Sequence, residues 1–497
     1  MLRAAPPRVR DSYSVRRAGR RVLLRPPRME VPERPIGAKL ELTYHCNLRC
    51  SFCYTDSPRR TLARTAEMED ADWRRIVDQV IEIGVLEAVV TGGEPLLRRD
   101  LTLEVIERLT GAGVLTILNT NGWFVDGTVA DQLAAAGARV HISIDGASSE
   151  LHEASRGVRG SWRRAVEAAD MLLCRGVAVQ MVHVVTPRNE GTFGDLLEQM
   201  RLLGPSSVRI TSVGKIGAAS RGGAWAVDLQ ALQRTVDRFG SPPRPRVLMG
   251  GDGIAHSVMA TERAPRAFLV RPNGAFLADS HHPFSFGHAA RQPLLECWHG
   301  LRESWRTERV ESWRRGARSP EQAAARDLVA YRDDEEPVAG IAPEPGSARK
   351  GGKELDAALE LLATKAPDFP ADGRGGVEAA NHRVRELALR RRYRLSNLRW
   401  SGSSGDERMV RVTSTGEARA LNASAGHVMD ALDGGAPADA AAALLRVNLG
   451  IDRDRAERDA LTATGALVEA GIAVPALAPR DDLARAASDG SLSGLPD

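Results

Sequence analysis

Three of the five cysteines in this 497-residue chain lie close enough in sequence to hold one iron–sulfur cluster. Cys46, Cys50 and Cys53 have the spacing Cys-x3-Cys-x2-Cys, and cysteine thiolates are the usual ligands of such clusters. Three thiolates on a [4Fe-4S] cluster leave one iron without a protein ligand, so this iron can bind a substrate or a cofactor. A structural zinc site is the alternative, but it commonly uses two Cys-x2-Cys pairs, and the sequence has no second pair.

The elements that must position these cysteines form a regular series. Short runs rich in β-branched residues alternate with amphipathic segments of helical period, and a last helix is expected over residues 225–239. Six such units predict a parallel α/β sheet with helices outside, and six is short of a full eightfold barrel. We therefore expect a partial (β/α)6 barrel. The predicted strands are residues 39–43, 86–91, 114–118, 140–144, 177–185 and 208–213.

Each polar motif of this region lies at the C-terminal end of a predicted strand, where parallel barrels carry their chemistry. Any one of these motifs alone would be an ordinary turn. Their shared placement instead predicts one site at the mouth of the barrel. The motifs are the cysteine segment, residues 92–95 (Gly-Gly-Glu-Pro), residues 119–122 (Asn-Thr-Asn-Gly) and residues 143–146 (Ser-Ile-Asp-Gly).

The cysteine spacing, with the aromatic Phe52 just before the last cysteine, resembles the signature of the radical S-adenosylmethionine (SAM) superfamily. The resemblance implies that the open iron of a [4Fe-4S] cluster chelates the amino and carboxylate groups of SAM. One electron from the cluster then cleaves SAM to methionine and a 5′-deoxyadenosyl radical, which abstracts hydrogen from the substrate. A reducing partner such as flavodoxin or ferredoxin is expected to supply the electron.

The same resemblance assigns roles to individual residues. Cys46, Cys50 and Cys53 would bind the cluster, and Phe52 would pack beside the adenine. Glu94 would accept from the ammonium of the methionine, and Arg156 would meet the SAM carboxylate, a role that suits a guanidinium fork. Glycines would let the backbone come close to the ligand. The other expected SAM-binding residues are Gly92, Gly93, Asn119, Asn121 and Ser143.

Residues 246–315 resemble the short extension that follows the barrel in SPASM and twitch radical SAM enzymes. A Pro-Asn-Gly sequence between apolar runs predicts a hairpin over residues 268–277. In those subfamilies the extension carries cysteines for auxiliary clusters, but here only Cys297 remains, which cannot hold a four-cysteine cluster. We expect a degenerate extension. Cys297 could donate a hydrogen atom to a substrate radical, and a thiol packed beside Trp298 is the alternative.

The C-terminal third predicts a linker over residues 316–389 and a small winged-helix-like α+β domain over residues 390–478. Short strands followed by three helices resemble PqqD-like domains, which recognise ribosomally made precursor peptides. This implies that a leader peptide adds a strand to the sheet edge and rests against the third helix. DNA binding is the alternative, but acidic residues offset the arginines of that helix. The ends are expected to be a flexible basic arm (1–35), with a short hairpin around residues 13–24, and a disordered tail (479–497).

Composition narrows the partners and the location. The net charge of +4 is small for this length and argues against nucleic-acid binding. No apolar run approaches the length of a membrane span, and clustered thiols fit a reducing cytoplasm. Together these features predict a cytoplasmic radical SAM enzyme that modifies a precursor peptide by hydrogen abstraction. The alternatives are an enzyme acting on a small-molecule or cofactor precursor, and a peptide carrier without catalysis.

Overall fold

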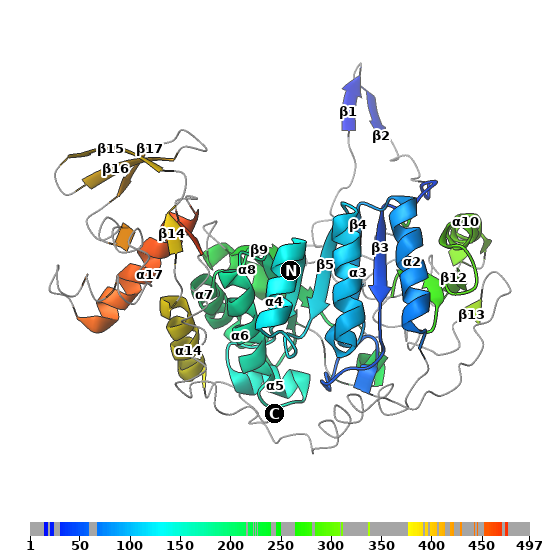
Figure 1. Cartoon of the computed structure of the whole chain (residues 1–497), viewed down its shortest axis with the longest axis horizontal. Helices are drawn as coiled ribbons and strands as arrows, with labels where there is room; N and C mark the ends of the chain where they lie inside the picture. Colours follow the sequence, from blue (N-terminus) through cyan, green and yellow to red (C-terminus); the bar gives the residue numbers. More distant parts are fainter. Residues whose placement is uncertain are drawn as a thin grey trace, which may run out of the picture.

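A computed structural model describes the fold (Figure 1). The described residues are 14–17, 20–23, 30–58, 67–214, 217–221, 223, 225, 227–239, 245–249, 264–280, 284–308, 310–311, 336–337, 376–390, 393–395, 398–404, 407–412, 418–421, 428–429, 442, 445, 452–469 and 473–475. The sequence also predicts one helix within the linker, at residues 355–362, and two adjacent histidines, His281 and His282, follow the predicted hairpin. These residues lie outside the described ranges.

One sheet of 11 strands forms the centre of the molecule. All six predicted strands of the barrel are confirmed, and they pair in parallel in chain order. A seventh parallel strand, β9, pairs with β8 and was missed because residue 246 was placed at the start of the extension. The sheet has two edge strands, so the described strands form an open sheet and not a closed barrel. The parallel strands are β3 (Gly37–Glu41), β4 (Glu87–Thr91), β5 (Leu115–Thr120), β6 (Arg139–Ser143), β7 (Val179–Val185), β8 (Ser207–Ser212) and β9 (Arg246–Met249).

Helices cover one face of this sheet, and Figure 1 shows several of them in front of the strands. The helix that begins at Asp70 starts at a capping box between Glu69 and Asp72, and it ends at Gly84 in the left-handed conformation. A short helix at residues 149–156 was not predicted. The helices are α2 (Asp70–Ile83), α3 (Arg99–Gly111), α4 (Gly127–Ala136), α5 (Ser149–Arg156), α6 (Ser161–Cys174), α7 (Phe193–Leu203) and α8 (Leu229–Phe239).

The two faces of the sheet differ in character because successive strand residues point to opposite sides. Leu40, Val90 and Ile142 belong to the large apolar core that the helices complete. The opposite side, which we call the inner face, carries the alternate residues. We define the inner face as residues 39, 41, 87, 89, 91, 117, 119, 139, 141, 143, 180, 182, 184, 207, 209, 211, 246 and 248.

The predicted hairpin of the extension is confirmed, and it continues the barrel sheet. Strand β10 (Ala267–Val270) pairs in parallel with β3 and antiparallel with β11 (Ala275–Leu277). The turn closes through Gly274, whose φ of 91° favours glycine. The extension then continues with β12 (Phe284–His288), α10 (Leu294–Ser304) and β13 (Glu336–Pro337).

The C-terminal domain contains short strands, as the sequence predicted, and their pairing was not predicted. Strands β15, β16 and β17 form an antiparallel sheet, and β14 pairs with β18. The first two predicted helices fall mostly outside the described ranges, and the third is α17 (Arg453–Glu469). The predicted N-terminal hairpin is confirmed as β1 (Ser14–Arg17) and β2 (Arg20–Leu23). The domain's strands are β14 (Tyr393–Leu395), β15 (Leu398–Ser404), β16 (Glu407–Val412), β17 (Ala418–Leu421) and β18 (Ala473–Pro475).

Helix α14 (Val377–Arg390) joins this domain to the barrel, although the sequence analysis placed it in a linker. Ala380 and Val384 belong to the same apolar core as the barrel helices. Arg383 forms an ion pair of 2.9 Å with Glu167 on α6, and α14 also packs on α7 and contacts α17. The prediction missed this helix because glycine- and proline-rich composition was extended past residue 376, over a segment with apolar residues at helical spacing.

Among the helices in the described ranges, none is both long enough and apolar enough to cross a membrane.

Candidate active site

The cysteine loop leaves β3 and is held between the ends of two other elements. On one side the backbone N–H of Gly93 donates to the carbonyl of Thr43 at 2.7 Å, and Glu94 donates to His45 at 2.7 Å. On the other side, the backbone N–H of Arg49 donates to the carbonyl of Arg156 at 2.9 Å. The loop is therefore fixed at the C-terminal edge of the sheet, as the sequence predicted.

The three thiols of the loop lie close enough to influence one another. Burial raises the pKa of Cys50 to about 11 and that of Cys46 well above its usual value, and the thiol of Cys53 adds to both shifts. Nitrogen donors surround them, because Arg156 Nη1 lies 3.6 Å from Cys50 Sγ and Asn121 Nδ2 lies 3.9 Å from Cys46 Sγ. This donor set fits a cluster held by thiolates.

The thiols do not form a preformed metal site. Within the described ranges, no group of three or more His, Cys, Asp or Glu side chains has an arrangement that could hold a metal ion. We expect the thiols to deprotonate and converge as a cluster is assembled, because metal binding and local folding are coupled.

Gly92 and Gly93 are required by the cysteine loop itself. A Cβ atom on Gly93 would lie 2.1 Å from the carbonyl oxygen of His45, and one on Gly92 would lie 2.5 Å from that of Thr43. Gly92 also has a φ of 150°. The close backbone approach that the sequence analysis expected for a ligand is made here by the loop.

Glu94 is fully buried and links the end of β4 to that of β5. Its carboxylate accepts from the backbone N–H of Leu96 at 3.1 Å, from Thr120 Oγ1 at 2.8 Å and from the backbone N–H of Asn121 at 2.8 Å. Burial raises its pKa to about 7 despite these bonds. Oε2 accepts one bond, from the backbone N–H of Asn121, and a carboxylate oxygen has room for a second. Glu94 can therefore still accept from an ammonium group.

Arg156 is positioned by Asp145, a residue whose role the sequence analysis missed. Arg156 Nε and Asp145 Oδ2 form an ion pair of 2.5 Å, with 9% and 0% of the two side chains exposed. The guanidinium also lies 5.3 Å from the ring centroid of Phe52. The sequence predicts Asp145 as part of the Ser-Ile-Asp-Gly motif at the barrel mouth, without a role of its own. The available signal was a carboxylate at a strand end with an arginine at the end of the next helix.

A second polar group on the inner face was also missed. The hydroxyl of Tyr54, directly after the last cysteine, donates to Glu41 Oε1 at 2.9 Å. Lys39 Nζ donates to the same hydroxyl at 3.1 Å. The available signal was the alternation of Lys39 and Glu41 with apolar residues along one strand.

The remaining predicted site residues are placed differently. Asn121 Nδ2 donates to Asn47 Oδ1 in the cysteine loop at 2.8 Å. Asn119 and Ser143 lie on the inner face, and Asn119 Oδ1 is buried without a hydrogen-bond partner in the described structure. Cys174 is half-buried at the end of α6, away from this group.

Cys297 lies apart from the cysteine loop. It is buried in the apolar core that includes Trp298, and a Cβ atom on Gly287 would lie 2.5 Å from its Sγ. Burial raises its pKa to about 12. These surroundings are those of a packed thiol, and we give Cys297 no part in the proposed reaction.

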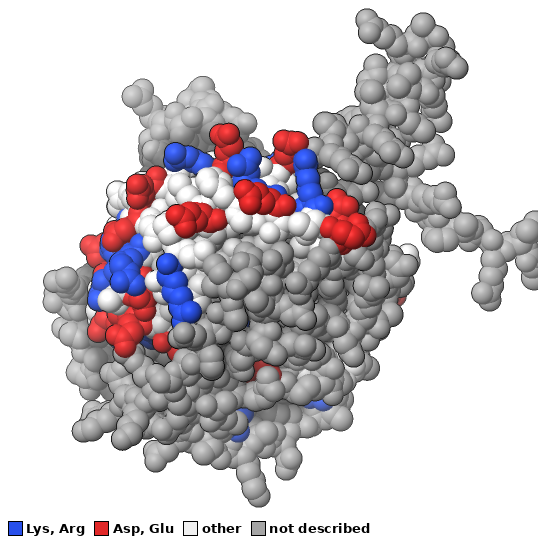
Figure 2. All heavy atoms as spheres, turned by 90° about the vertical axis from the view of Figure 1, so that its right-hand side faces the viewer, with Lys and Arg blue, Asp and Glu red and all other residues white. Residues whose placement is uncertain are grey.

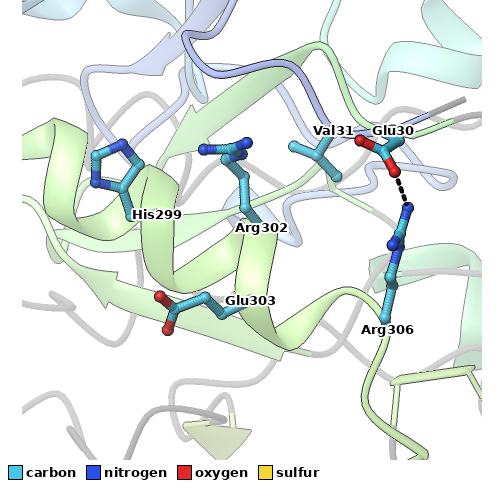
Figure 3. Close-up of a pocket in the computed structure, with 6 residues that line it drawn as sticks. All are labelled: Glu30, Val31, His299, Arg302, Glu303 and Arg306. Atoms are coloured by element: carbon cyan, nitrogen blue, oxygen red, sulfur yellow. Dashed lines mark hydrogen bonds and ion pairs between the residues drawn. The ribbon is translucent and has the colours of Figure 1, made fainter.

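A surface hollow along α10 is also separate from the site. Figure 3 shows its side chains, including an ion pair of 2.9 Å between Arg306 and Glu30 at one end. None of the cysteines lines it. Its lining residues are Glu30, Val31, His299, Arg302, Glu303 and Arg306.

Comparison with known proteins identifies two families. The model for the radical SAM superfamily matches residues 40–200, and the model for coenzyme PQQ synthesis protein D (PqqD) matches residues 408–473. The chain belongs to the radical SAM superfamily and carries a PqqD domain near its C-terminus. Enzymes of this superfamily use a [4Fe-4S] cluster and SAM.

Two curated relatives illustrate the range of the family. The chain is 30% identical over 297 residues to a PqqA peptide cyclase of Methylocella silvestris, covering 54% of this chain and 74% of that protein. It is 32% identical over 200 residues to an AdoMet-dependent heme synthase of Oleidesulfovibrio alaskensis, covering 40% of this chain and 51% of that protein. The chain thus spans about half the length of the first relatives it matches.

Two solved structures share the general course of the chain. One is Streptococcus suis SuiB bound to precursor peptide SuiA, with a TM-score of 0.45 and 17% identity, covering 58% of this chain and 68% of that one. The other is anSMEcpe with bound AdoMet, with a TM-score of 0.44 and 15% identity, covering 71% and 99%.

Proposed function

We propose that this protein modifies a ribosomally made precursor peptide by radical SAM chemistry. The observation that carries the proposal is the combination of an intact cysteine loop at the sheet edge with a PqqD domain joined to the same barrel through α14. When bound, the cluster and SAM supply the means to abstract a hydrogen atom from an unactivated carbon.

Different residues at the sheet edge bind the cluster and the parts of SAM. Cys46, Cys50 and Cys53 hold the cluster. Glu94 accepts from the ammonium of SAM, and Arg156, held by Asp145, meets its carboxylate. Gly92 and Gly93 keep the cysteine loop in place, Phe52 packs beside the adenine, and the other polar contacts come from Asn119, Asn121 and Ser143.

The C-terminal domain binds the leader of the precursor. In the sheet order β15-β16-β17, each outer strand has only one partner among the described strands, so a leader can add a strand there. The charges of α17 support a peptide over DNA. Arg453 pairs with Glu457 at 2.7 Å and Arg455 with Asp459 at 3.9 Å within the same helix, and these arginines are not directed at phosphates.

A reducing partner such as flavodoxin or ferredoxin supplies the electron, and we place the protein in the cytoplasm because three of its thiols are clustered. A second candidate function is radical SAM chemistry on a small-molecule substrate. It is supported by the likeness to an AdoMet-dependent heme synthase. The PqqD domain favours the peptide, and the intact cysteines argue against a carrier without catalysis.

The test combines two variants of the full chain after anaerobic reconstitution with iron and sulfide. Replacing Cys46, Cys50 and Cys53 by alanine should abolish formation of 5′-deoxyadenosine from SAM. Ending the chain after Arg390 should leave that formation intact and sharply reduce modification of a peptide encoded beside the gene. Undiminished cleavage in the first variant, or undiminished peptide modification in the second, would refute the proposal.

A further inference from the structure

The inner face of β6, β8 and β9 carries three arginines. Arg139, Arg209 and Arg246 lie at alternate strand positions, opposite to the core residues Val140, Val208 and Val247. All three side chains are exposed. Among the described residues, no acidic side chain forms an ion pair with any of the three.

The neighbouring inner-face residues bring no negative charge. From β6 to β9 these positions hold only histidine, serine, glutamine, valine, threonine and leucine besides the arginines. Burial, together with Arg209 and Arg139, lowers the pKa of His141 to about 4, so this histidine is neutral near pH 7 and both arginines lie near it. The acidic inner-face residues are Glu41, which Tyr54 and Lys39 occupy, and Glu87 at the start of β4.

A second observation on this face points to a ligand with hydrogen-bond donors. Gln180 is the register neighbour of both His141 and Ser207, and its Nε2 donates to Ser207 Oγ at 2.8 Å. Its Oε1 is buried and has no hydrogen-bond partner in the described structure. A buried acceptor without a donor is costly, and a backbone N–H of a bound peptide would satisfy it.

Figure 2 shows the side of the molecule at the right of Figure 1, and on its described part lysine and arginine side chains are interspersed with aspartate and glutamate. Helix α14 packs on α6 and α7 and contacts α17, so the C-terminal domain lies on the β7–β9 side of the sheet. The arginines are therefore on the half of the sheet nearest the proposed leader-binding domain.

We propose that the inner face of β6–β9 binds an acidic stretch of the precursor peptide. The inference rests on the proposed function and deepens it by naming the chemistry of the substrate. Arg139, Arg209 and Arg246 pair with carboxylates, and Gln180 accepts from the peptide backbone.

The test measures binding by the full-length, cluster-free chain, so its readout does not depend on catalysis. The probe is a fluorescein-labelled eight-residue Glu-Gly repeat, followed by fluorescence anisotropy at about 50 mM and about 300 mM salt. The variant Arg139→Gln/Arg209→Gln/Arg246→Gln changes exposed side chains only. The control Arg74→Gln/Arg75→Gln/Arg108→Gln removes the same number of charges from α2 and α3.

The wild-type chain and the control should bind the acidic probe with similar affinity, and binding should weaken at higher salt. The inner-face variant should lose affinity on the order of tenfold, since each exposed arginine–carboxylate pair contributes modestly. Equal affinity of the variant and the wild type, no binding by the wild type, or equal binding of a Lys-Gly repeat would overturn the inference. SAM cleavage by the reconstituted variant, measured separately, should match the wild type and tests only the proposed function.

Discussion

Replacing Asp145 by asparagine should remove the negative partner of Arg156 and leave most of the surrounding geometry intact. Asp145 Oδ1 accepts from the backbone N–H of Val184 at 2.9 Å, and an amide oxygen can keep this bond. The backbone N–H of Asp145 donates to His152 Nδ1 at 3.0 Å and is unchanged by the substitution. What is lost is the charge that faces the guanidinium at 2.5 Å.

The magnitude follows from the burial of both groups. Burial by itself opposes the charged form of Arg156, but Asp145 and Cys50 together raise its pKa above the ordinary value. Removing one partner of a buried ion pair costs about 3–5 kcal/mol, because the other charge is left without compensation. The retained bond to Val184 argues for the lower end, about 3 kcal/mol. With a urea m-value of about 3 kcal/mol/M, the unfolding midpoint should fall by about 1 M.

The assay is urea unfolding of the cluster-free chain, followed by tryptophan fluorescence under reducing conditions. Asp145→Asn should lower the midpoint, and Asp145→Asn/Arg156→Met should recover part of the loss because no buried charge remains. The control is Glu104→Gln, which breaks an exposed pair with Arg74 and should cost less than about 1 kcal/mol. If Asp145→Asn and Glu104→Gln shift the midpoint equally, the reasoning about this buried pair is wrong.

Two further substitutions test the loop and the domain junction. Gly93→Ala should strongly reduce the iron bound per chain after reconstitution, because the added Cβ would lie 2.1 Å from the carbonyl oxygen of His45. The control Gly111→Ala has open space around the added Cβ and should leave the iron content unchanged. Equal iron contents of the two variants would contradict this prediction. Val384→Asp should detach α14 from the barrel, because it removes about 1.5–3 kcal/mol of stabilisation from apolar burial, and limited proteolysis should then cut the helix faster. The control Ala379→Asp lies on the exposed side of the helix and should leave the digestion rate unchanged. Equal digestion rates of the two variants would contradict this prediction.

The fold could be predicted from the sequence where one strong pattern decides it. The β-branched run ending at Thr91 and the Gly-Gly-Glu-Pro motif after it identified β4 and its site loop, because a buried parallel strand must be apolar and its chemistry must follow at the C-terminal end. The hairpin turn at Gly274 was likewise decided by local turn chemistry. Helix α14 has a weaker signal: Ala380 and Val384 have helical spacing, but the glycine- and proline-rich sequence before residue 376 indicated a linker.

The candidate site was predictable in its parts and not in its connections. The motifs located Cys46 and Glu94 at the same edge of the sheet, and the family resemblance added Arg156; in the structure the cysteine loop forms backbone hydrogen bonds with Glu94 and Arg156. The contact between Asp145 and Arg156 depends on how α5 returns toward the end of β6. No periodicity in the sequence encodes the distance between these two side chains. The role of Gly92 and Gly93 could not be predicted from the sequence either. A glycine that lets a ligand approach the backbone and one that lets a neighbouring loop approach it look the same in a sequence.

The position of α14 connects the two halves of the proposed function. Gly376, just before its first turn, lies against Glu150 of α5 near the sheet edge that holds the cysteine loop, and β14 of the PqqD-containing region follows its other end. A helix of 14 residues is roughly 21 Å long at 1.5 Å per residue. An extended peptide needs about six residues to cover that distance.

A leader bound at the β15–β17 sheet is therefore separated from the cysteine loop by about the length of α14. The precursor peptide must cross this distance along the barrel. Arg139, Arg209 and Arg246, which form no ion pair with a described acidic residue, lie on the β6–β9 half of the sheet, where the C-terminal domain also lies. An acidic segment of the precursor peptide is therefore the substrate feature that this architecture favours.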